Sequence, residues 1–95
     1  MIKVAVLGYG NIGSGVVQVL LKNKETIAKK AGDEIVPACV LDLREFPGDV
    51  MEDKVVKDIN LITQNPEISI VVETMGGTKP AYAFVKACLE AGKHV

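Results

Sequence analysis

Aromatic residues and residues with reactive side chains are scarce in this chain of 95 residues. It contains no tryptophan, two tyrosines, two phenylalanines, two cysteines and one histidine. Cys39 and Cys88 are too few and too far apart to indicate a disulfide framework or a metal site. We therefore expect both thiols to be buried and reduced, and we expect His94 to have a structural role.

Long hydrophobic runs and an excess of charge of one sign are absent as well. The 11 basic and 12 acidic residues give a net charge of −1, and no apolar stretch approaches the roughly 18 residues that span a bilayer. Residues 1–3 lead directly into an apolar segment rather than into a signal peptide. We therefore expect a cytoplasmic protein that binds neither nucleic acid nor a membrane.

The most specific pattern lies at the N-terminus. Residues 2–7 are largely apolar and predict a short buried strand, and a Gly-x-Gly-x-x-Gly motif follows with Gly8, Gly10 and Gly13. A helical period of apolar residues then begins at residue 12. Because nine glycines in 95 residues can produce this spacing by chance, the strand and the helix on either side supply the specificity.

Each glycine of the motif has a separate physical reason. Gly8 permits a tight turn out of the strand, Gly10 leaves the backbone open to a pyrophosphate, and Gly13 lets the helix pack close to the sheet. The unpaired amides of the first helical turn and the positive end of the helix dipole favour a bound anion. The motif therefore predicts a dinucleotide site, and the alternative is a compact turn without a ligand.

Strands and helices alternate over the rest of the chain. The first helix is predicted over 11–30, and its apolar face is expected to comprise Ile12, Val16, Val19, Leu20, Asn23 and Ile27. Strands are predicted at 35–41, 55–56 and 68–73 and from His94, with a loop at 44–53 and helices at 59–64 and from Pro80 to Gly92. This order predicts one α/β domain with a Rossmann-type doubly wound parallel sheet, about half complete, in the order 3-2-1-4-5.

Ligands of such sheets bind beyond the carboxyl ends of the strands, where the loops 8–13, 42–44 and 74–77 are expected to meet. Asp42 ends the second strand and is a candidate partner for an adenosine ribose. It follows the last glycine of the motif by 29 residues, rather than the usual 20 or so, and a long first helix explains the excess. Arg44 is suited to a 2′-phosphate. The alternative for Asp42 is an ordinary polar residue at a strand end, and the alternative for Arg44 is a solvated charge in a loop.

Three segments resemble the nucleotide-binding domain of homoserine dehydrogenase. They are Gly-Tyr-Gly-Asn-Ile-Gly-Ser-Gly-Val-Val at 8–17, Asn-Pro-Glu-Ile-Ser-Ile-Val-Val-Glu-Thr-Met-Gly-Gly at 65–77 and Glu-Ala-Gly-Lys-His-Val at 90–95. The resemblance extends over nearly the whole chain. Enzymes similar to glucose-fructose oxidoreductase share Ala-Gly-Lys-His-Val but tend to have Thr-Pro at the end of the equivalent strand. The Glu-Thr-Met-Gly-Gly run therefore favours homoserine dehydrogenase.

The resemblance implies NAD(P)-dependent interconversion of aspartate semialdehyde and homoserine, in the biosynthesis of threonine and methionine. It implies that the pyrophosphate contacts are Gly8, Gly10, Asn11, Ile12 and Gly13. It places the adenosine end at the region from Asp42 to Arg44, and the wall that faces nicotinamide and its ribose at Thr74, Met75, Gly76 and Gly77. Two departures from the family pattern are Tyr9 and Asn11, which stand where Leu and Thr are commoner.

In the family, the catalytic lysine and the substrate-binding carboxylates lie further along the chain, in a separate domain. We therefore expect residues 1–95 to be a dinucleotide-binding domain without catalytic residues, and to be inactive alone. Asp42 slightly favours NAD over NADP, and an apolar edge on the strand 68–73 predicts a homo-oligomer. Two alternatives remain, the cofactor domain of a dehydrogenase similar to glucose-fructose oxidoreductase and a nucleotide-sensing module without catalytic activity.

Overall fold

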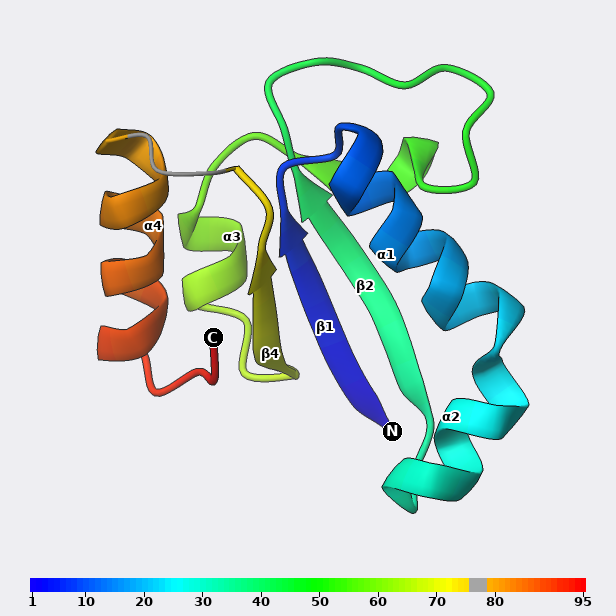
Figure 1. The fold of residues 1–95 in the computed structure, drawn as a ribbon. Helices are drawn as coiled ribbons and strands as arrows, with labels where there is room; N and C mark the ends of the chain where they lie inside the picture. The colour runs from blue at the N-terminus through cyan, green and yellow to red at the C-terminus, as the bar shows by residue number, and fades with distance from the viewer. Residues whose placement is uncertain (76–78) are drawn as a thin grey trace.

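A computed structural model of the chain describes residues 1–75 and 79–95 (Figure 1). Its elements, in chain order, are β1 (Ile2–Leu7), α1 (Asn11–Lys22), α2 (Lys24–Ala31), β2 (Ile35–Leu41), a 3₁₀ turn η1 (Glu52–Lys54), β3 (Val55–Val56), α3 (Asn60–Thr63), β4 (Ile68–Glu73) and α4 (Lys79–Glu90). Strands alternate with helices, as predicted. The predicted strands at 35–41, 55–56 and 68–73 are confirmed.

The sheet is parallel, and its strand order is β3-β2-β1-β4. This order agrees with the first four positions of the predicted doubly wound sheet. Leu7 at the end of β1 is level with Leu41 at the end of β2 and with Glu73 at the end of β4. The register therefore brings the three loops that follow these strands to one edge of the sheet.

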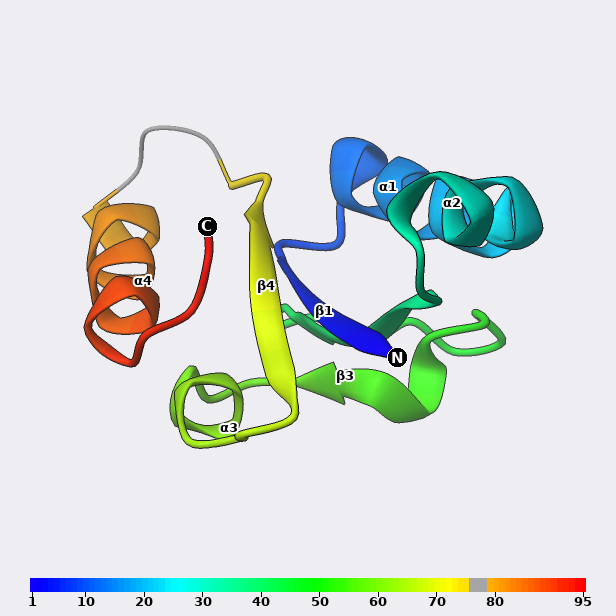
Figure 2. The same cartoon turned by 90° about the horizontal axis from the view of Figure 1, so that it is seen from below.

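Two layers of apolar side chains cover opposite faces of the sheet, because successive residues of a strand point to opposite sides. Ala5 and Leu7 of β1 belong to a cluster with Ile62 of α3 and Cys88 of α4. Val6 belongs to the second cluster, on the face of α1, whose other members are Tyr9, Val17, Val40 and Met51. Figure 2 shows α1 and α2 on one side of the sheet and α3 on the other. Cys39 and Cys88 are both free and buried, as predicted.

The helix predicted over 11–30 is wrong in one respect, because the structure divides it at Asn23. The backbone of Asn23 leaves helical geometry with φ −106° and ψ 26°, and its side-chain amide donates to the Val19 carbonyl at 3.3 Å. Asparagine competes for backbone groups in this way and is therefore disfavoured inside helices. In the part of the chain that the structure describes, no helix is long and apolar enough to cross a membrane.

The predicted apolar face of α1 is wrong in part. Val16 packs against the buried cluster and Leu20 is partly buried, as predicted. Ile12 is 70% exposed and Val19 is 54% exposed, whereas Gly13 and Val17 are buried against the sheet. Gly13 must approach the turn after β1, and Val17 lies one turn later on the same side of the helix. The glycine contact therefore sets the rotation of α1 about its axis, and two large apolar side chains are left in solvent.

The C-terminal residues lie beside β4. α4 ends at Glu90, and Gly92 follows with φ +83°, in agreement with the predicted stop. The amide of Val71 donates to the carbonyl of His94 at 2.7 Å, and the amide of His94 donates to the carbonyl of Ser69 at 3.0 Å. A fifth strand position is thus occupied, and the expectation that the edge of β4 is uncovered is wrong over these residues.

Candidate dinucleotide site

The turn between β1 and α1 requires glycine at two positions. Gly8 has φ +92°, a conformation that residues with a side chain rarely adopt. A Cβ atom on Gly13 would lie 2.0 Å from the carbonyl oxygen of Gly8, so that α1 packs on this turn only because residue 13 has no side chain. These contacts agree with the roles that the sequence predicts for both glycines.

Gly10 leaves the surface above the turn open. It precedes α1 with extended backbone at φ −84° and ψ −155°, and among the described residues the nearest group to a Cβ atom there would be the Arg44 guanidinium, at 3.9 Å. The first amides of α1, those of Asn11, Ile12 and Gly13, precede the first helical hydrogen bond, which runs from the Ser14 amide to the Gly10 carbonyl at 2.9 Å. No acidic residue lies in this first turn. The end of α1 is therefore suited to an anion.

Thr74 joins the end of β4 to the glycine turn. Its hydroxyl lies 2.9 Å from the carbonyl oxygen of Leu7 and 3.0 Å from that of Gly8, and its amide donates to the Leu7 carbonyl at 3.0 Å. The Thr74 hydroxyl thus braces the turn. The amide of Met75 donates to the Glu73 carboxylate. The predicted contacts of Gly76 and Gly77 lie outside the described residues.

Asp42 and Arg44 bind each other at the end of β2. The Arg44 side chain donates from Nε at 3.0 Å and from Nη2 at 2.9 Å, and its amide donates at 2.9 Å. The amide of Tyr9 donates to the same carboxylate at 3.0 Å. The guanidinium hydrogen bonds hold the pKa of the Asp42 carboxyl well below its usual range, although burial opposes this shift. The Asp42 side chain is 9% exposed and the Arg44 side chain 65% exposed.

A hollow of about 490 Å³ lies where the three loops meet. It is lined by Gly8, Gly10, residues 41–44, Lys57, Thr74, Met75 and Phe84. Sequence reasoning missed Lys57, whose ammonium donates to the carbonyl of Leu43 at 2.9 Å. Because Lys57 directly follows β3, the strand beside β2, the predicted strand order could have indicated it. The predicted loops therefore converge on one cavity with a largely apolar floor.

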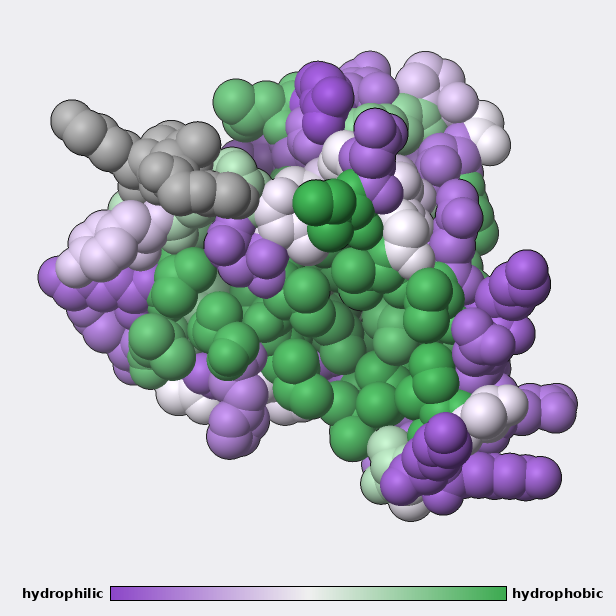
Figure 3. Space-filling view, in the orientation of Figure 1, coloured by the Kyte–Doolittle hydropathy of each residue, from purple (hydrophilic) through white to green (hydrophobic). Residues whose placement is uncertain are grey.

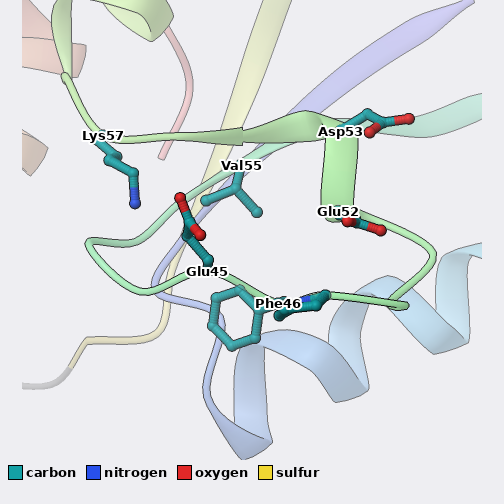
Figure 4. A pocket seen from close by; sticks show the side chains of 7 residues that line it. Glu45, Phe46, Glu52, Asp53, Val55 and Lys57 are labelled. Carbon is teal, nitrogen blue, oxygen red and sulfur yellow. The ribbon is translucent and has the colours of Figure 1, made fainter.

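A smaller hollow of about 270 Å³ lies under the segment 45–57 (Figure 4). Its lining includes the carboxylates of Glu45, Glu52 and Asp53 and the side chains of Val55 and Lys57. Three carboxylates make this hollow unfavourable for a phosphate. The larger hollow, beside the glycine turn and the first turn of α1, is therefore the candidate ligand site.

The sequence of this chain is similar to those of known proteins. The family model described as "Homoserine dehydrogenase, NAD binding domain" matches residues 8–95. The chain is 39% identical to the homoserine dehydrogenase of Pseudomonas aeruginosa over 95 residues and 38% identical to that of Methylobacillus glycogenes over 99 residues. These alignments cover 99% of this chain and 22% and 24% of those proteins.

A solved structure gives the same result. The crystal structure of a homoserine dehydrogenase from Thiobacillus denitrificans matches with a TM-score of 0.88 at 33% identity, over 99% of this chain and 22% of that one. The chain thus spans about a quarter of the length of these relatives. The family match decides between the two dehydrogenase families that share the motifs. The chain belongs to the homoserine dehydrogenase family, in which it corresponds to the NAD-binding domain.

Proposed function

We propose that residues 1–95 form a dinucleotide-binding domain whose site is the hollow beside the glycine turn. The pyrophosphate binds over Gly10 and the first amides of α1, including those of Asn11 and Ile12. The adenosine end lies towards Asp42 and Arg44. The nicotinamide end lies towards Thr74 and Met75, and the sequence adds Gly76 and Gly77. The observation that carries this proposal is the open backbone at Gly10, which meets both the helix end and the cavity.

In a longer protein, this domain would serve the NAD(P)-dependent interconversion of aspartate semialdehyde and homoserine. When bound, the cofactor supplies the hydride chemistry, and the protein orients it. The residues described here support the binding of the cofactor. We propose no catalytic residue among them, and we expect the chain alone to bind the cofactor without turnover. A homoserine oxidation assay above a buffer blank tests this expectation, and turnover by the chain would contradict it.

Gly10→Val tests the site itself. A valine at this position is compatible with its negative φ, and among the described residues the nearest group to its Cβ would be the Arg44 guanidinium at 3.9 Å, but its side chain would occupy the place of the pyrophosphate. We expect calorimetric titration to show NAD affinity reduced more than tenfold, with an unchanged melting temperature. The control is Gly15→Ala on α1, where an added Cβ has no neighbour within 4 Å among the described residues beyond its own helix. Equal NAD affinity of wild type and Gly10→Val would refute the proposed site.

We propose that the domain prefers NAD to NADP. Asp42 carries a negative charge at the expected ribose, and this charge repels a 2′-phosphate. Arg44 is the group that could offset the repulsion, but it donates two side-chain hydrogen bonds to Asp42. A tenfold preference for NAD over NADP corresponds to about 1.4 kcal/mol. One contact between the Asp42 carboxylate and the ribose is sufficient for a difference of this size. Dissociation constants of both cofactors for wild type and Asp42→Ala should show a preference for NAD that the substitution removes. An unchanged ratio would show that Asp42 does not read the ribose.

We also propose a cytoplasmic location and self-association. Two buried free thiols are compatible with a reducing compartment. Apolar side chains that remain exposed on α1 support contact with a second copy of the chain.

A further inference from the structure

The middle residue of the Gly-x-Gly turn is a buried tyrosine with a polar partner. Tyr9 is 3% exposed and packs in the apolar cluster on the α1 face of the sheet. Its hydroxyl donates to the Asp49 carboxylate at 2.5 Å, and the amide of Met51 donates to the same oxygen at 2.8 Å. Burial and this carboxylate together raise the pKa of Tyr9 to about 12. A segment 40 residues further along the chain is thereby joined to the glycine turn.

Tyr9 also contacts Asp42 and Phe46, which precede Asp49 in the chain. Its amide donates to the Asp42 carboxylate at 3.0 Å. Its ring meets the Phe46 ring edge to face, with the centroids 4.9 Å apart and an interplanar angle of 89°. The Arg44 guanidinium lies over the Phe46 ring, 5.3 Å from its centroid, and it also binds Asp42. These contacts close a ring of interactions that begins and ends at Tyr9. Figure 4 shows the Phe46 ring directed towards the loop between β1 and α1.

The residues from 43 to 51, which we name the 43–51 loop, are otherwise mostly exposed and outside regular structure. Ordering such a loop costs conformational entropy for every residue that is fixed. A ligand that must order the loop on binding loses this free energy from its affinity, whereas a loop that is already fixed avoids the loss. Contacts that fix the loop before the ligand arrives therefore increase affinity without touching the ligand.

We propose that Tyr9 is a positioning residue that fixes the 43–51 loop against the glycine turn. Through Asp49 and Phe46 it keeps Arg44 and Asp42 in place at the adenosine end of the hollow. The inference rests on the proposed cofactor site, and it assigns a binding role to a side chain that points away from that site. A leucine at this position, commoner in the family pattern, would lack the hydroxyl that binds Asp49.

Tyr9→Phe tests the proposal because it removes the hydroxyl and keeps the ring. Without cofactor, we expect faster amide hydrogen exchange in the 43–51 loop and unchanged exchange in β1. In calorimetric titration, we expect NAD affinity to fall about threefold to tenfold, which corresponds to one lost hydrogen bond. Affinity for AMP, which carries only the adenosine end, should fall by the same factor. Tyr82→Phe is the matched control, because Tyr82 is 74% exposed.

A second variant tests the hydroxyl's partner directly. Asp49→Ala should show both effects of Tyr9→Phe at least in full, because it also removes the acceptor of the Met51 amide. Adding Tyr9→Phe to Asp49→Ala should cause no further loss, because the tyrosine hydroxyl acts through Asp49. Asp49→Asn retains an acceptor and should restore most of the affinity. Unchanged loop exchange in Tyr9→Phe would overturn the inference, as would faster exchange with unaltered NAD and AMP affinity. Absence of NAD and NADP binding in wild type would instead overturn the cofactor site, and with it the positioning role, even if loop exchange changes.

Discussion

At the scale of single residues, Lys93 shows how a charged side chain can serve the fold. The residue is 8% exposed, and its ammonium donates to the carbonyl oxygens of Asn65 at 2.9 Å and Ile68 at 2.6 Å. Asn65 lies in the turn that leads from α3 into β4, and Ile68 is the first residue of β4. Lys93 therefore fastens the segment after α4 to the start of an adjacent strand. Its place in the Ala-Gly-Lys-His-Val run thus has a structural reason that does not require a ligand.

Lys93→Met should destabilise the fold. Methionine fills a similar volume but removes the ammonium donor from both carbonyls. The Asn65 carbonyl keeps the Ile68 amide as a donor at 3.2 Å, whereas the Ile68 carbonyl loses a buried donor, and an unsatisfied buried polar group costs about 1–3 kcal/mol. Urea unfolding should show a lower free energy of unfolding by about this amount. Lys86→Met is the control, because Lys86 is exposed and its ion pair with Glu90 spans 3.8 Å, a contact expected to contribute only about 0.3–0.5 kcal/mol. Equal stability of both variants would mean that the Lys93 contacts contribute nothing to folding.

The residues of the site illustrate what a sequence can specify. Spacing and residue type alone selected Gly8, Gly13, Asp42 and Arg44 as candidates. Gly8, Asp42 and Arg44 line one hollow, and Gly13 packs on the turn at Gly8. That Asp42 and Arg44 bind each other was not foreseen. The pairing depends on a local turn in which the Arg44 amide and side chain both donate to the carboxylate. Conformations of this kind are decided by tertiary contacts, here by the Tyr9 amide as well.

At the scale of elements, the strands were predictable and the rotation of the first helix was not. A buried parallel strand is a short apolar run, and the runs at β1, β2 and β4 have clear ends. The apolar period of α1 allowed more than one buried face, and the period alone favoured Ile12 and Val19. The requirement that Gly13 contact the turn overrode that choice. Because no Cβ fits at residue 13, this close approach fixes the rotation of α1, and Ile12 and Val19 stay exposed.

The division of the predicted helix at Asn23 also depends on a single residue. Sequence patterns seldom locate a single break, because the apolar period continues through Asn23 to Ile27. The structure shows that Asn23 both ends α1 and precedes α2, and that the Ile27 amide donates to its carbonyl at 2.9 Å. One polar residue thus changes the helix direction while most backbone hydrogen bonds remain. Because the proposed site involves only the first turn of α1, this break lies away from the predicted anion-binding end.

At the scale of the whole molecule, α1 and α2 cover only part of one face of the sheet. Figure 3 shows a continuous hydrophobic surface over β4 and β1, reaching towards α1 and α2. Ile70 and Val72 of β4 are half-buried, and Ile12 and Val19 of α1 are exposed. Surfaces of this kind mark contact sites in soluble proteins. His94 occupies part of the β4 edge. We therefore expect copies of the chain to associate through the apolar face rather than through this edge.

We therefore expect the chain to form dimers or larger assemblies as its concentration rises from micromolar to millimolar, measured by sedimentation equilibrium. Because the contact is apolar, sulfate should strengthen it, and low ionic strength should not. Val19→Lys places a charge on the exposed flank of α1 and should shift the equilibrium towards monomer. Leu61→Lys is the matched control, since Leu61 is 57% exposed but lies on α3, on the opposite side of the sheet. A monomer at every concentration, or equal loss of assembly in both variants, would show that this face is not the contact between copies.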